Sequence, residues 1–213
     1  MQDLLILGAG GTSREIAEAV EDINRCEKTW NLLGFLDDDP AALGRTVDGV
    51  EVLGPISSAQ GSSAFLIIGI AAVRNRRVRK GIVESLGLCR DRFATVIHPA
   101  SVSRHAKLGF GSALLHNVVI TPDAVIGDHV IIEYGAMIGH DALVEDFATI
   151  GPGAIVSGSV RVGENAFLGA GSMLRDNLTV GEGAVIGMGA VVVGDVPPRA
   201  TVVGSPAREL RPA

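Results

Sequence analysis

The chain of 213 residues has few cysteines and no long apolar run. Its two cysteines, Cys26 and Cys89, are too few and too far apart to predict a disulfide framework or a metal-binding knuckle. No apolar run reaches the roughly 18 residues that a membrane span needs. The opening MQDLLILGAGG lacks the basic segment of a signal peptide and is expected to form a strand. We therefore expect a cytoplasmic protein without a membrane partner.

Positive charge and aromatic residues are also scarce. Lys and Arg together number 18 against 24 Asp and Glu, which gives a formal net charge of −6. Nucleic acid is therefore disfavoured as the main ligand, because phosphate backbones need a basic surface. A phosphorylated small molecule stays compatible, since a helix N-terminus and a few arginines can hold it. Aromatics make up only 4% of the chain while glycines number 28, a balance that favours thin, regular coils.

A six-residue repeat runs from Thr95 to Val196. Divided into hexads from Thr95, this segment gives 17 repeats with Val, Leu or Ile at every second position and Ala, Ser, Val or Leu at every sixth. Three short strands would make one triangular coil, with the aliphatic residues filling the interior and the small ones allowing the corners. The pattern predicts a left-handed parallel β-helix.

Glycine often follows the aliphatic residue of a hexad. We expect tight packing and unusual backbone angles there, as at Gly109, Gly127, Gly139, Gly151, Gly163, Gly169, Gly181 and Gly187. The outer faces of such prisms are flat and usually bury one another. The expected assembly is therefore a cyclic homotrimer.

The first part of the chain has a different pattern, in which apolar strands alternate with amphipathic helices. Strands are predicted at residues 3–8, 32–39, 50–53 and 64–71, and helices from Ser13 to about Arg25 and from Asn75 to Gly87. This order predicts an α/β unit with a parallel sheet. We expect a Rossmann-like domain over residues 1–92 and a β-helix domain over residues 93–213.

A glycine-rich turn joins the first predicted strand to the first predicted helix. It contains Gly8, Gly10, Gly11 and Thr12, and it would point free backbone N–H groups at a bound anion. Ser13 stands where the dinucleotide fingerprint has its third glycine, so NAD is disfavoured. A nucleotide-sugar pyrophosphate or sugar hydroxyl groups fit better, and a turn that merely starts a helix is the alternative.

Acidic residues end the second predicted strand. Asp37 and Asp38 lie where a carboxylate could accept hydrogen bonds from a ribose or a base. The alternative is an Asp-rich turn before Pro40. Both interpretations stay open.

The histidines do not predict a metal site. The separations known from β-helix carbonic anhydrases are not reproduced, so that zinc enzyme is disfavoured. His98 and His116 are 18 residues apart and would stack on one edge of adjacent coils, with Tyr134 next in the column. This column is typical of a surface or interface ladder. His105 and His129 are expected on the surface.

His140 is the candidate general base. It stands in the sequence I-G-H-D near the middle of the repeats, with Asp141 next to it, where two neighbouring prisms would form a groove. An imidazole there could take a proton from an amine or hydroxyl group, and a nearby carboxylate would hold the ring. A structural or merely exposed histidine is the alternative.

The chain resembles the NeuD/PglD family of bacterial sugar acyltransferases over its whole length. The resemblance rests on the opening I-L-G-A-G-G, on G-F-L-D-D, on the spacing from Gly69 to Arg74, on I-G-H-D and on the final V-V-G-S-P-A-R. In that family the N-terminal domain holds a sugar nucleotide. The β-helix binds acetyl-CoA in a groove between adjacent subunits of a trimer.

The resemblance implies a role for individual residues. His140 would be the general base and Asp141 the carboxylate that raises its basicity. Residues expected to contact the substrate are Gly10, Gly11, Thr12, Asp37, Asp38 and Gly69. Residues expected to contact acetyl-CoA are Thr149, which replaces a histidine of the family, and Gly158, Ala170, Met188, Gly204 and Arg208. Of these, Gly158, Ala170 and Met188 are expected to form one column. A turn at residues 204–207 that only caps the β-helix is the alternative for the last two.

The implied function is acetyl-CoA-dependent acetylation of the amino group of a nucleotide-activated sugar, such as a UDP-4-amino-4,6-dideoxy sugar, without a metal. Its place would be the synthesis of bacterial surface glycans or glycoproteins. Ile70 and Ala71 replace a polar pair of the family, a change expected to loosen or redirect substrate binding. Gly139 stands where the family often has an acid or histidine. The alternatives are O-acetylation of a sialic acid, serine or another hydroxyl acceptor, and a non-catalytic nucleotide-sugar-binding scaffold.

Overall fold

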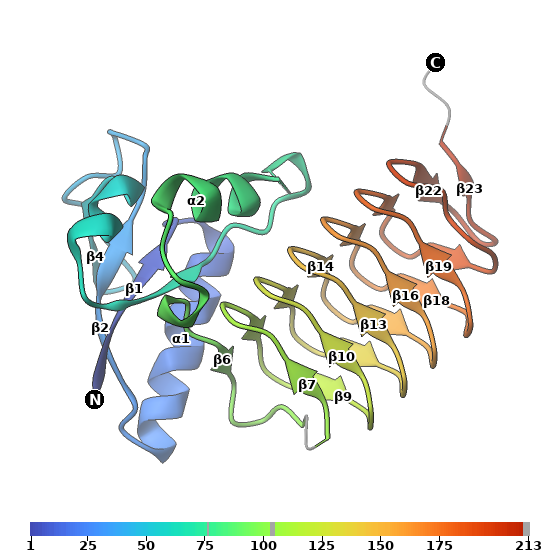
Figure 1. Cartoon of the computed structure of the whole chain (residues 1–213), viewed down its shortest axis with the longest axis horizontal. Helices are drawn as coiled ribbons and strands as arrows, with labels where there is room; N and C mark the ends of the chain where they lie inside the picture. The colour runs from blue at the N-terminus through green and yellow to red at the C-terminus, as the bar shows by residue number, and fades with distance from the viewer. Residues whose placement is uncertain (76, 103–104, 211–213) are drawn as a thin grey trace.

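The computed structural model describes residues 1–75, 77–102 and 105–210. An α/β part, coloured blue to green in Figure 1, lies at one end of a stack of coils that runs from green to red. The two architectures agree with those predicted from the sequence. The boundary between residues 92 and 93 stays a prediction. Ala94, which lies beyond this boundary, still donates a backbone hydrogen bond to Leu66 O of the α/β part (2.8 Å).

The α/β part contains one mixed sheet with the strand order β3-β4-β2-β1-β5. β1 pairs in parallel with both β2 and β5, β2 pairs in parallel with β4, and β3 is antiparallel to β4. The predicted parallel α/β sheet is confirmed, with the short antiparallel β3 as an unpredicted addition. The strands are β1 (Gln2–Leu7), β2 (Trp30–Leu36), β3 (Thr46–Val47), β4 (Val50–Gly54) and β5 (Phe65–Ile68).

Two α-helices accompany this sheet, and both differ from the prediction at their starts. α1 (Gly11–Cys26) begins two residues early, within the glycine turn, and buries Ile16, Ala19 and Val20. α2 (Val78–Leu86) begins later than Asn75, because a 3-10 turn, η2 (Val73–Asn75), comes before it. Further 3-10 turns are η1 (Ile56–Gly61) and η3 (Arg90–Arg92). Gly87 caps the end of α2, and its left-handed φ of 60° is a common way to stop a helix.

The C-terminal part is a parallel β-helix with three faces, as predicted. The first face contains β6 (Val96–Ile97), β8 (Ala113–Leu114), β11 (Ile131–Ile132), β14 (Thr149–Ile150), β17 (Phe167–Leu168), β20 (Val185–Ile186) and β22 (Thr201–Val203). The second face contains β9 (Val119–Ile120), β12 (Met137–Ile138), β15 (Ile155–Val156), β18 (Met173–Leu174) and β21 (Val191–Val192). The third face contains β7 (Lys107–Leu108), β10 (Val125–Ile126), β13 (Leu143–Val144), β16 (Arg161–Val162) and β19 (Thr179–Val180).

The coils repeat every 18 residues, as the pairing of Ile131 with Thr149 shows. Along the chain the first face leads to the second, the second to the third, and the third to the first face of the next coil. We call the turns after the first, second and third faces the first, second and third corners. The hexad at 101–106 includes residues 103 and 104, which lie outside the described residues.

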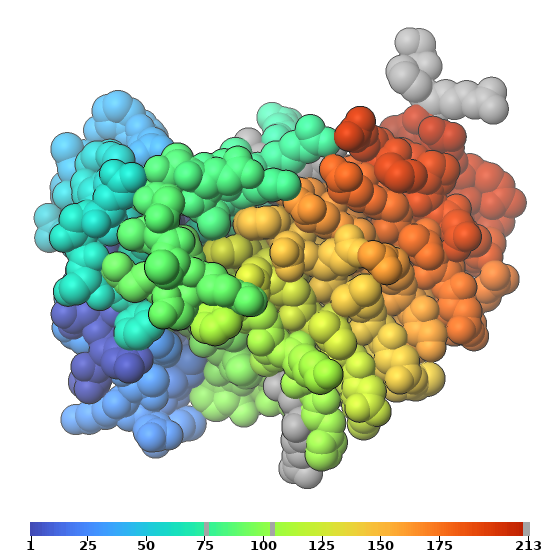
Figure 2. Space-filling view, viewed as in Figure 1, coloured from blue at the N-terminus to red at the C-terminus, as the bar shows by residue number. Residues whose placement is uncertain are grey.

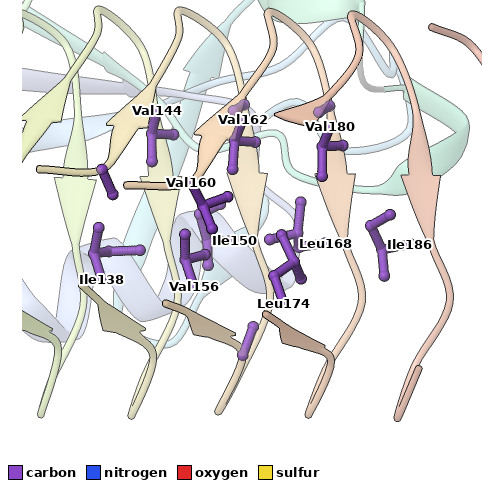
Figure 3. Close-up of a cluster of buried hydrophobic side chains, with 14 of the residues drawn as sticks. Ile138, Val144, Ile150, Val156, Val160, Val162, Leu168, Leu174, Val180 and Ile186 are labelled. Atoms are coloured by element: carbon purple, nitrogen blue, oxygen red, sulfur yellow. The ribbon is translucent and has the colours of Figure 1, made fainter. Parts of the chain in front are cut away.

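Aliphatic second positions of the hexads form the interior of the prism. Figure 3 shows them in columns, one from each face, with Val144, Val162 and Val180 as the clearest example. These side chains are fully buried and belong to one continuous apolar cluster. Burial of such side chains is the main stabilising contribution to the stack. The predicted role of the second position is confirmed except at Val102, which is 47% exposed.

The glycines that follow the aliphatic positions are explained by packing alone. A Cβ built on Gly139 would lie 2.5 Å from the backbone N of Gly158 in the next coil, and the other glycines of this set meet the next coil in the same way. Their φ angles are not positive, so the expectation of unusual backbone angles was wrong for them. Left-handed residues occur two positions later instead, as at Asp141 with φ 58°.

The α/β part packs on the first face and the third corner of the β-helix. Ile16 and Val20 of α1 share an apolar cluster with Ala113, Leu115 and Ile131 of the first face. Lys80 of α2 and Arg90 form ion pairs with Glu164 and Asp128 at the third corner. Figure 2 shows this side of the molecule as one continuous surface, with the α2 region in green against the yellow coils.

The C-terminal end of the stack differs from the regular coils. β23 (Arg208–Glu209) pairs antiparallel with β22 on the first face. On the third face, Val196 forms a bridge with Val180 and is followed by Pro197 and Pro198. The predicted end of the repeats near Val196 is confirmed.

Candidate active site

His140 lies at the second corner, in the turn between β12 and β13. Its Nδ1 is 2.8 Å from Oδ2 of Asp141, so the two adjacent residues form a hydrogen-bonded pair. Their side chains are 68% and 60% exposed, which leaves the pair open to a ligand. The left-handed backbone of Asp141 turns its carboxylate back toward the ring. With Nδ1–H donating to Asp141, Nε2 of a neutral His140 carries the free lone pair.

Gly158 occupies the same corner one coil later and lies against the imidazole. A Cβ built on Gly158 would lie 2.6 Å from Nε2 of His140, so only glycine leaves the ring this position. Ser159 N donates to His140 O (2.8 Å), which connects the two turns. Within the described part of the chain, the Gly158 N–H has no hydrogen-bond acceptor. A lone pair and a free donor therefore lie close together.

The glycine turn borders a second candidate site in the α/β part. A hollow of about 310 Å³ is lined by Gly8, Gly10, Gly11, Thr12, Asp37, Gly69, Ile70, Ala71 and Ala72. A Cβ at Gly10 or Gly11 would meet nothing within 4 Å, so the backbone at the start of α1 faces open space. Asp37 Oδ2 accepts the N–H of Ala9 (2.7 Å) and so fixes the turn. The hollow suits an anionic or hydroxyl-bearing ligand.

Asp38 does not join this hollow. Its Oδ1 accepts the N–H of Ile56 (2.9 Å) at the start of η1, which favours the alternative of a structural turn. Ser13 is buried, and its hydroxyl donates to Gly69 O (3.0 Å) across the top of the sheet. A side chain on Gly69 would overlap Ser13. Ser13, which stands where the fingerprint has its third glycine, therefore links α1 to the residue after β5 through this hydrogen bond.

The residues expected to contact acetyl-CoA do not form a single column. Ala170 and Met188 stack at the first corner, whereas Gly158 lies at the second corner. The expectation of one column was wrong, because 158 and 170 are 12 residues apart and 12 is two faces of an 18-residue coil. Met188 is 81% exposed and leads toward Gly204 and Arg208 at the end of the stack.

The first corner also carries the predicted aromatic ladder. The rings of His98 and His116 meet edge to face at 5.5 Å, and His116 stacks on Tyr134 at 5.3 Å. His98 is also 3.0 Å from Asp22 of α1, and this hydrogen bond lowers the pKa of the Asp22 carboxyl. The predicted column is confirmed, and Pro152, Ala170 and Met188 continue it at steps of 18 residues.

Thr149 and His129 were placed wrongly from the sequence. Thr149 is fully buried, and its hydroxyl accepts a hydrogen bond from Arg79 of α2 (2.9 Å), so it is not accessible to a cofactor. His129 is not on the surface, because Phe93 and Phe147 enclose its ring. Burial lowers the pKa of His129 to about 4. Both residues point out of the prism, and the α/β part covers them.

Glu133 was missed by the sequence analysis. Burial, and then repulsion by Glu15 of α1, raise the pKa of Glu133 to about 7. It lies between the first face and the α/β part, one residue before Tyr134. The only signal in the sequence is that Glu133 is an acid, whereas the equivalent positions of the two adjacent coils hold Leu115 and Gly151.

Residues 1–75, 77–102 and 105–210 contain no group of three or more His, Cys, Asp or Glu side chains placed to hold a metal ion. Among the helices described for the same ranges, none is long and apolar enough to cross a membrane.

Sequence profiles match both parts of the chain. Residues 3–86 match the PglD N-terminal domain. Residues 105–140 and 159–194 match the bacterial transferase hexapeptide (six repeats). The first profile therefore matches the α/β part, and the second matches the β-helix.

Several solved structures share the complete fold. A histidine-to-asparagine mutant of perosamine N-acetyltransferase from Caulobacter crescentus, in complex with CoA and GDP-perosamine, is 30% identical, with 100% of this chain and 98% of that chain covered and a TM-score of 0.86. The acetyltransferase domain of PglB from Neisseria gonorrhoeae, in complex with acetyl coenzyme A, is 34% identical, with 98% and 99% covered and a TM-score of 0.86.

A curated relative matches a shorter segment. The UDP-N-acetylbacillosamine N-acetyltransferase of Bacillus subtilis (strain 168) is 33% identical over 120 residues, which are 54% of this chain and 52% of that protein. The matched segment thus spans about half the length of this relative.

Proposed function

The chain belongs to the NeuD/PglD family of hexapeptide-repeat sugar acyltransferases, and we propose that it transfers an acetyl group from acetyl-CoA to the amino group of a nucleotide-activated amino sugar. The relatives named for this reaction act on GDP-perosamine or on a UDP-linked amino sugar. The pairing of a glycine-turn hollow with a β-helix supports the same division of labour here. Because both co-substrates are made in the cytoplasm, we propose that compartment.

The observation that carries the proposal is the His140–Asp141 pair above Gly158. Asp141 holds Nδ1–H of the ring at 2.8 Å and thereby leaves Nε2 as a base. As the sugar nitrogen attacks the thioester carbonyl, Nε2 takes a proton from that nitrogen. The free N–H of Gly158 is suited to stabilise the oxyanion, a contribution of about 3 kcal/mol for a well-placed donor.

His140 and the Gly158 N–H also account for the formation of the products. The tetrahedral intermediate collapses, the C–S bond breaks, and the amide forms. The imidazolium then returns the proton to the departing thiolate, so that CoA leaves as a thiol and His140 is neutral again. No metal is needed for any of these steps.

We propose a cyclic homotrimer with the second face at its centre. The outward side chains of this face form an apolar stripe in which Met137 and Met173 are about half exposed. Val119, Ile155 and Val191 complete the stripe on the outer side of the same strands. An apolar stripe of this length on a flat sheet favours burial against copies of itself.

The position of His140 supports an active site shared between subunits. The α/β part covers the first face, whereas His140 lies at the second corner, which is the edge of the prism opposite that face. In a trimer the second corner of one subunit would meet the first corner of its neighbour. Tyr134 and His140 belong to the same coil, so rotation about the three-fold axis brings them to the same height.

Acetyl-CoA would then follow the first corner past Ala170 and Met188 to Gly204 and Arg208. The acetyl end would reach the level of Tyr134, next to His140 and Gly158 of the adjacent subunit. Arg208 is exposed, with one guanidinium nitrogen donating to Ala207 O (2.8 Å), and its remaining N–H groups would meet the phosphates of the nucleotide end. Gly10, Gly11, Thr12, Asp37 and Gly69 would face the nucleotide sugar.

The test is release of free thiol from acetyl-CoA in the presence of UDP- and GDP-linked 4-amino-4,6-dideoxy sugars. For His140→Ala we expect kcat to fall by about 10²- to 10⁴-fold with the KM for acetyl-CoA little changed. His105→Ala, at an exposed histidine of the first coil, is the control and should behave as the unmodified protein. Unchanged turnover of His140→Ala would contradict the role of His140.

Two other functions give different results in the same assay. An O-acetyltransferase would release thiol with sialic acids or serine and not with amino sugars. A scaffold would release none, yet a nucleotide sugar would raise its melting temperature and acetyl-CoA would not. The His140–Asp141 pair favours an enzyme over a scaffold.

A further inference from the structure

Arg79 crosses the joint between the two parts of the molecule. It projects from α2, is completely buried, and reaches both the α/β part and the β-helix. Its Nη1 donates to Ile70 O (2.7 Å). Its Nη2 donates to the backbone oxygens of Phe147 and Ala148 and to the hydroxyl of Thr149. One guanidinium group therefore connects three separate segments of the chain.

The burial of this charge calls for an explanation. None of the acids in the described ranges forms a hydrogen bond or ion pair with Arg79, and its Nε has no acceptor there. Burial lowers its pKa to about 10 although the charge of Glu133, which forms no hydrogen bond with it, acts in the opposite direction, so the group still carries its charge at neutral pH. A buried charge without a paired acid is costly, and it is retained here by a set of carbonyl oxygens. An apolar side chain could fill the same space at a lower cost, so packing alone does not account for an arginine.

The two ends of this contact belong to the two candidate sites. Ile70, whose carbonyl accepts from Nη1, lines the hollow at the glycine turn together with Ala71 and Ala72. Phe147 and Ala148 close the coil of residues 131–148, and the same coil carries His140 at another corner. Arg79 thus fixes the distance along the prism axis between one wall of the hollow and the coil of the candidate base.

We propose that Arg79 is a positioning residue that holds the Ile70–Ala72 wall of the nucleotide-sugar hollow at the height of the His140 coil. The proposal rests on the proposed function, because it assigns the hollow to the nucleotide sugar. The three-fold rotation of a trimer preserves height, so the same contact sets the wall against the His140 of the adjacent subunit. A sugar bound at the wrong height would miss the base.

The geometry of arginine is what the contact uses. Its planar fork places two nitrogens in fixed directions, one toward Ile70 and the other toward the coil. Lysine keeps the charge and much of the length, yet its single nitrogen cannot serve both ends. Arg79→Lys is therefore the informative variant. Lys80→Met is the matched control, since Lys80 joins the same helix to the same corner through Glu164 (2.8 Å) without contacting the hollow.

The first experiment is hydrogen exchange of the full chain, measured on peptides that contain residues 69–72, in which the Gly69 N–H donates to Leu7 O (2.8 Å). We expect at least about tenfold faster exchange of this protected amide in Arg79→Lys and no change in Lys80→Met. Exchange in the coil interior around Ile150 should stay slow in both. This readout needs no substrate, so it judges the positioning role even if no acceptor sugar is turned over.

The second experiment is steady-state kinetics with the amino sugar that the wild-type protein accepts. For Arg79→Lys we expect the KM for the nucleotide sugar to rise about tenfold while the KM for acetyl-CoA stays within about twofold. Lys80→Met should change neither. Absence of turnover in the wild-type protein would contradict the proposed function and not the positioning role.

Three results would overturn the proposal. One is unchanged exchange of the Gly69 amide in the 69–72 segment of Arg79→Lys. Another is an equal rise of both KM values together with a lower melting temperature, which would mark Arg79 as a general structural residue. The third is the same selective loss in Lys80→Met. An Arg79→Met variant would remove the buried charge and could fail to fold. Arg79→Lys still tests the positioning role in that case, because it retains the buried charge and the carbonyl partners in the coil.

Discussion

Gly158 and His140 are separated by 18 residues and touch each other at one corner of the prism. For Gly158→Ala we expect kcat to fall about 100-fold, because the added methyl group would lie 2.6 Å from Nε2 and displace the ring. The backbone φ of Gly158 is not left-handed, so alanine brings no strain of its own. Thiol release and thermal unfolding measured side by side would separate loss of activity from loss of the fold.

Gly194→Ala is the control for this substitution. Gly194 follows β21, and a Cβ there would meet nothing within 4 Å. Its activity and melting temperature should both match the unmodified protein. Full activity of Gly158→Ala would mean that the imidazole works from another position than the one described here.

His129 gives a prediction about pH. Its folded pKa of about 4 lies below the 6.5 of an unfolded histidine, so the folded state favours the neutral ring. The stability contributed by His129 is therefore present above pH 6.5 and is lost as the pH falls toward 4. His129→Phe should keep about 2 kcal/mol more of its pH 7 stability at pH 5 than the wild type does. Urea unfolding at both pH values measures this.

Phenylalanine suits position 129 because Phe147 occupies the same corner one coil later with the same left-handed backbone. The exposed His105 again serves as control, and His105→Phe should leave the pH dependence unchanged. Equal acid sensitivity of His129→Phe and the wild type would contradict the buried, neutral histidine.

Contacts between individual residues were predictable where residues 18 positions apart stack in adjacent coils. The column of His98, His116 and Tyr134 follows from the 18-residue step, and the His140–Asp141 pair follows from adjacency. The burial of His129, Thr149 and Glu133 did not follow from the sequence. All three point out of the prism and lie near residues more than 30 positions away along the chain: Phe93 for His129, Arg79 for Thr149 and Glu15 for Glu133.

At the scale of elements, the second face is the surface that the proposed trimer needs. Met173 lies at the centre of its apolar stripe and is about half exposed in the isolated chain. Met173→Lys should convert the trimer to monomers, since three buried ammonium groups would meet near the three-fold axis. Light scattering after size exclusion measures the mass. Activity should fall more than about tenfold if the site needs two subunits.

Thr179→Lys on the third face is the matched control. Thr179 is an exposed outward residue of β19, and the lysine it receives lies outside the proposed interface. This variant should remain a trimer. Dissociation by Thr179→Lys alone would move the interface from the second face to the third.

The strands of the β-helix were predictable to the residue, because a slip of one position would expose every aliphatic side chain. The start of α2 was not, since the basic run before it continues the helical pattern while the chain forms a 3-10 turn. Gly158, Ala170 and Met188 were assigned to one column because they share the same position within a hexad. The hexad position does not tell which of the three faces a residue follows. Counting in steps of 18 rather than 6 separates Gly158 from Ala170 and Met188.

At the scale of the whole molecule, the opposite positions of the hollow and of His140 predict complementation between subunits. Gly11→Asp would place a carboxylate at the mouth of the hollow, where a Cβ has open space, and repel a diphosphate. This variant and His140→Ala should each be inactive alone. Mixed trimers from equal amounts of the two should recover about a quarter of the wild-type activity, the fraction of sites with one intact part from each neighbour.

Coexpression with two different purification tags yields such mixed trimers. A site contained in one subunit would give no recovery, since every subunit of the mixture carries a defect. Recovery to a quarter would therefore establish the shared site. Recovery near zero with verified mixed trimers would place both parts within one chain.

The final coil has one further consequence, which concerns solubility. A stack of parallel strands ends in unpaired backbone groups that can recruit another chain and grow into fibres. Here β23 covers the first-face edge in the antiparallel sense, so the outermost strand no longer matches the direction of an incoming coil. On the third face, Pro197 and Pro198 offer no N–H groups to an incoming strand. The segment expected to lie beside the cofactor thus also keeps a repetitive fold from adding copies of itself end to end.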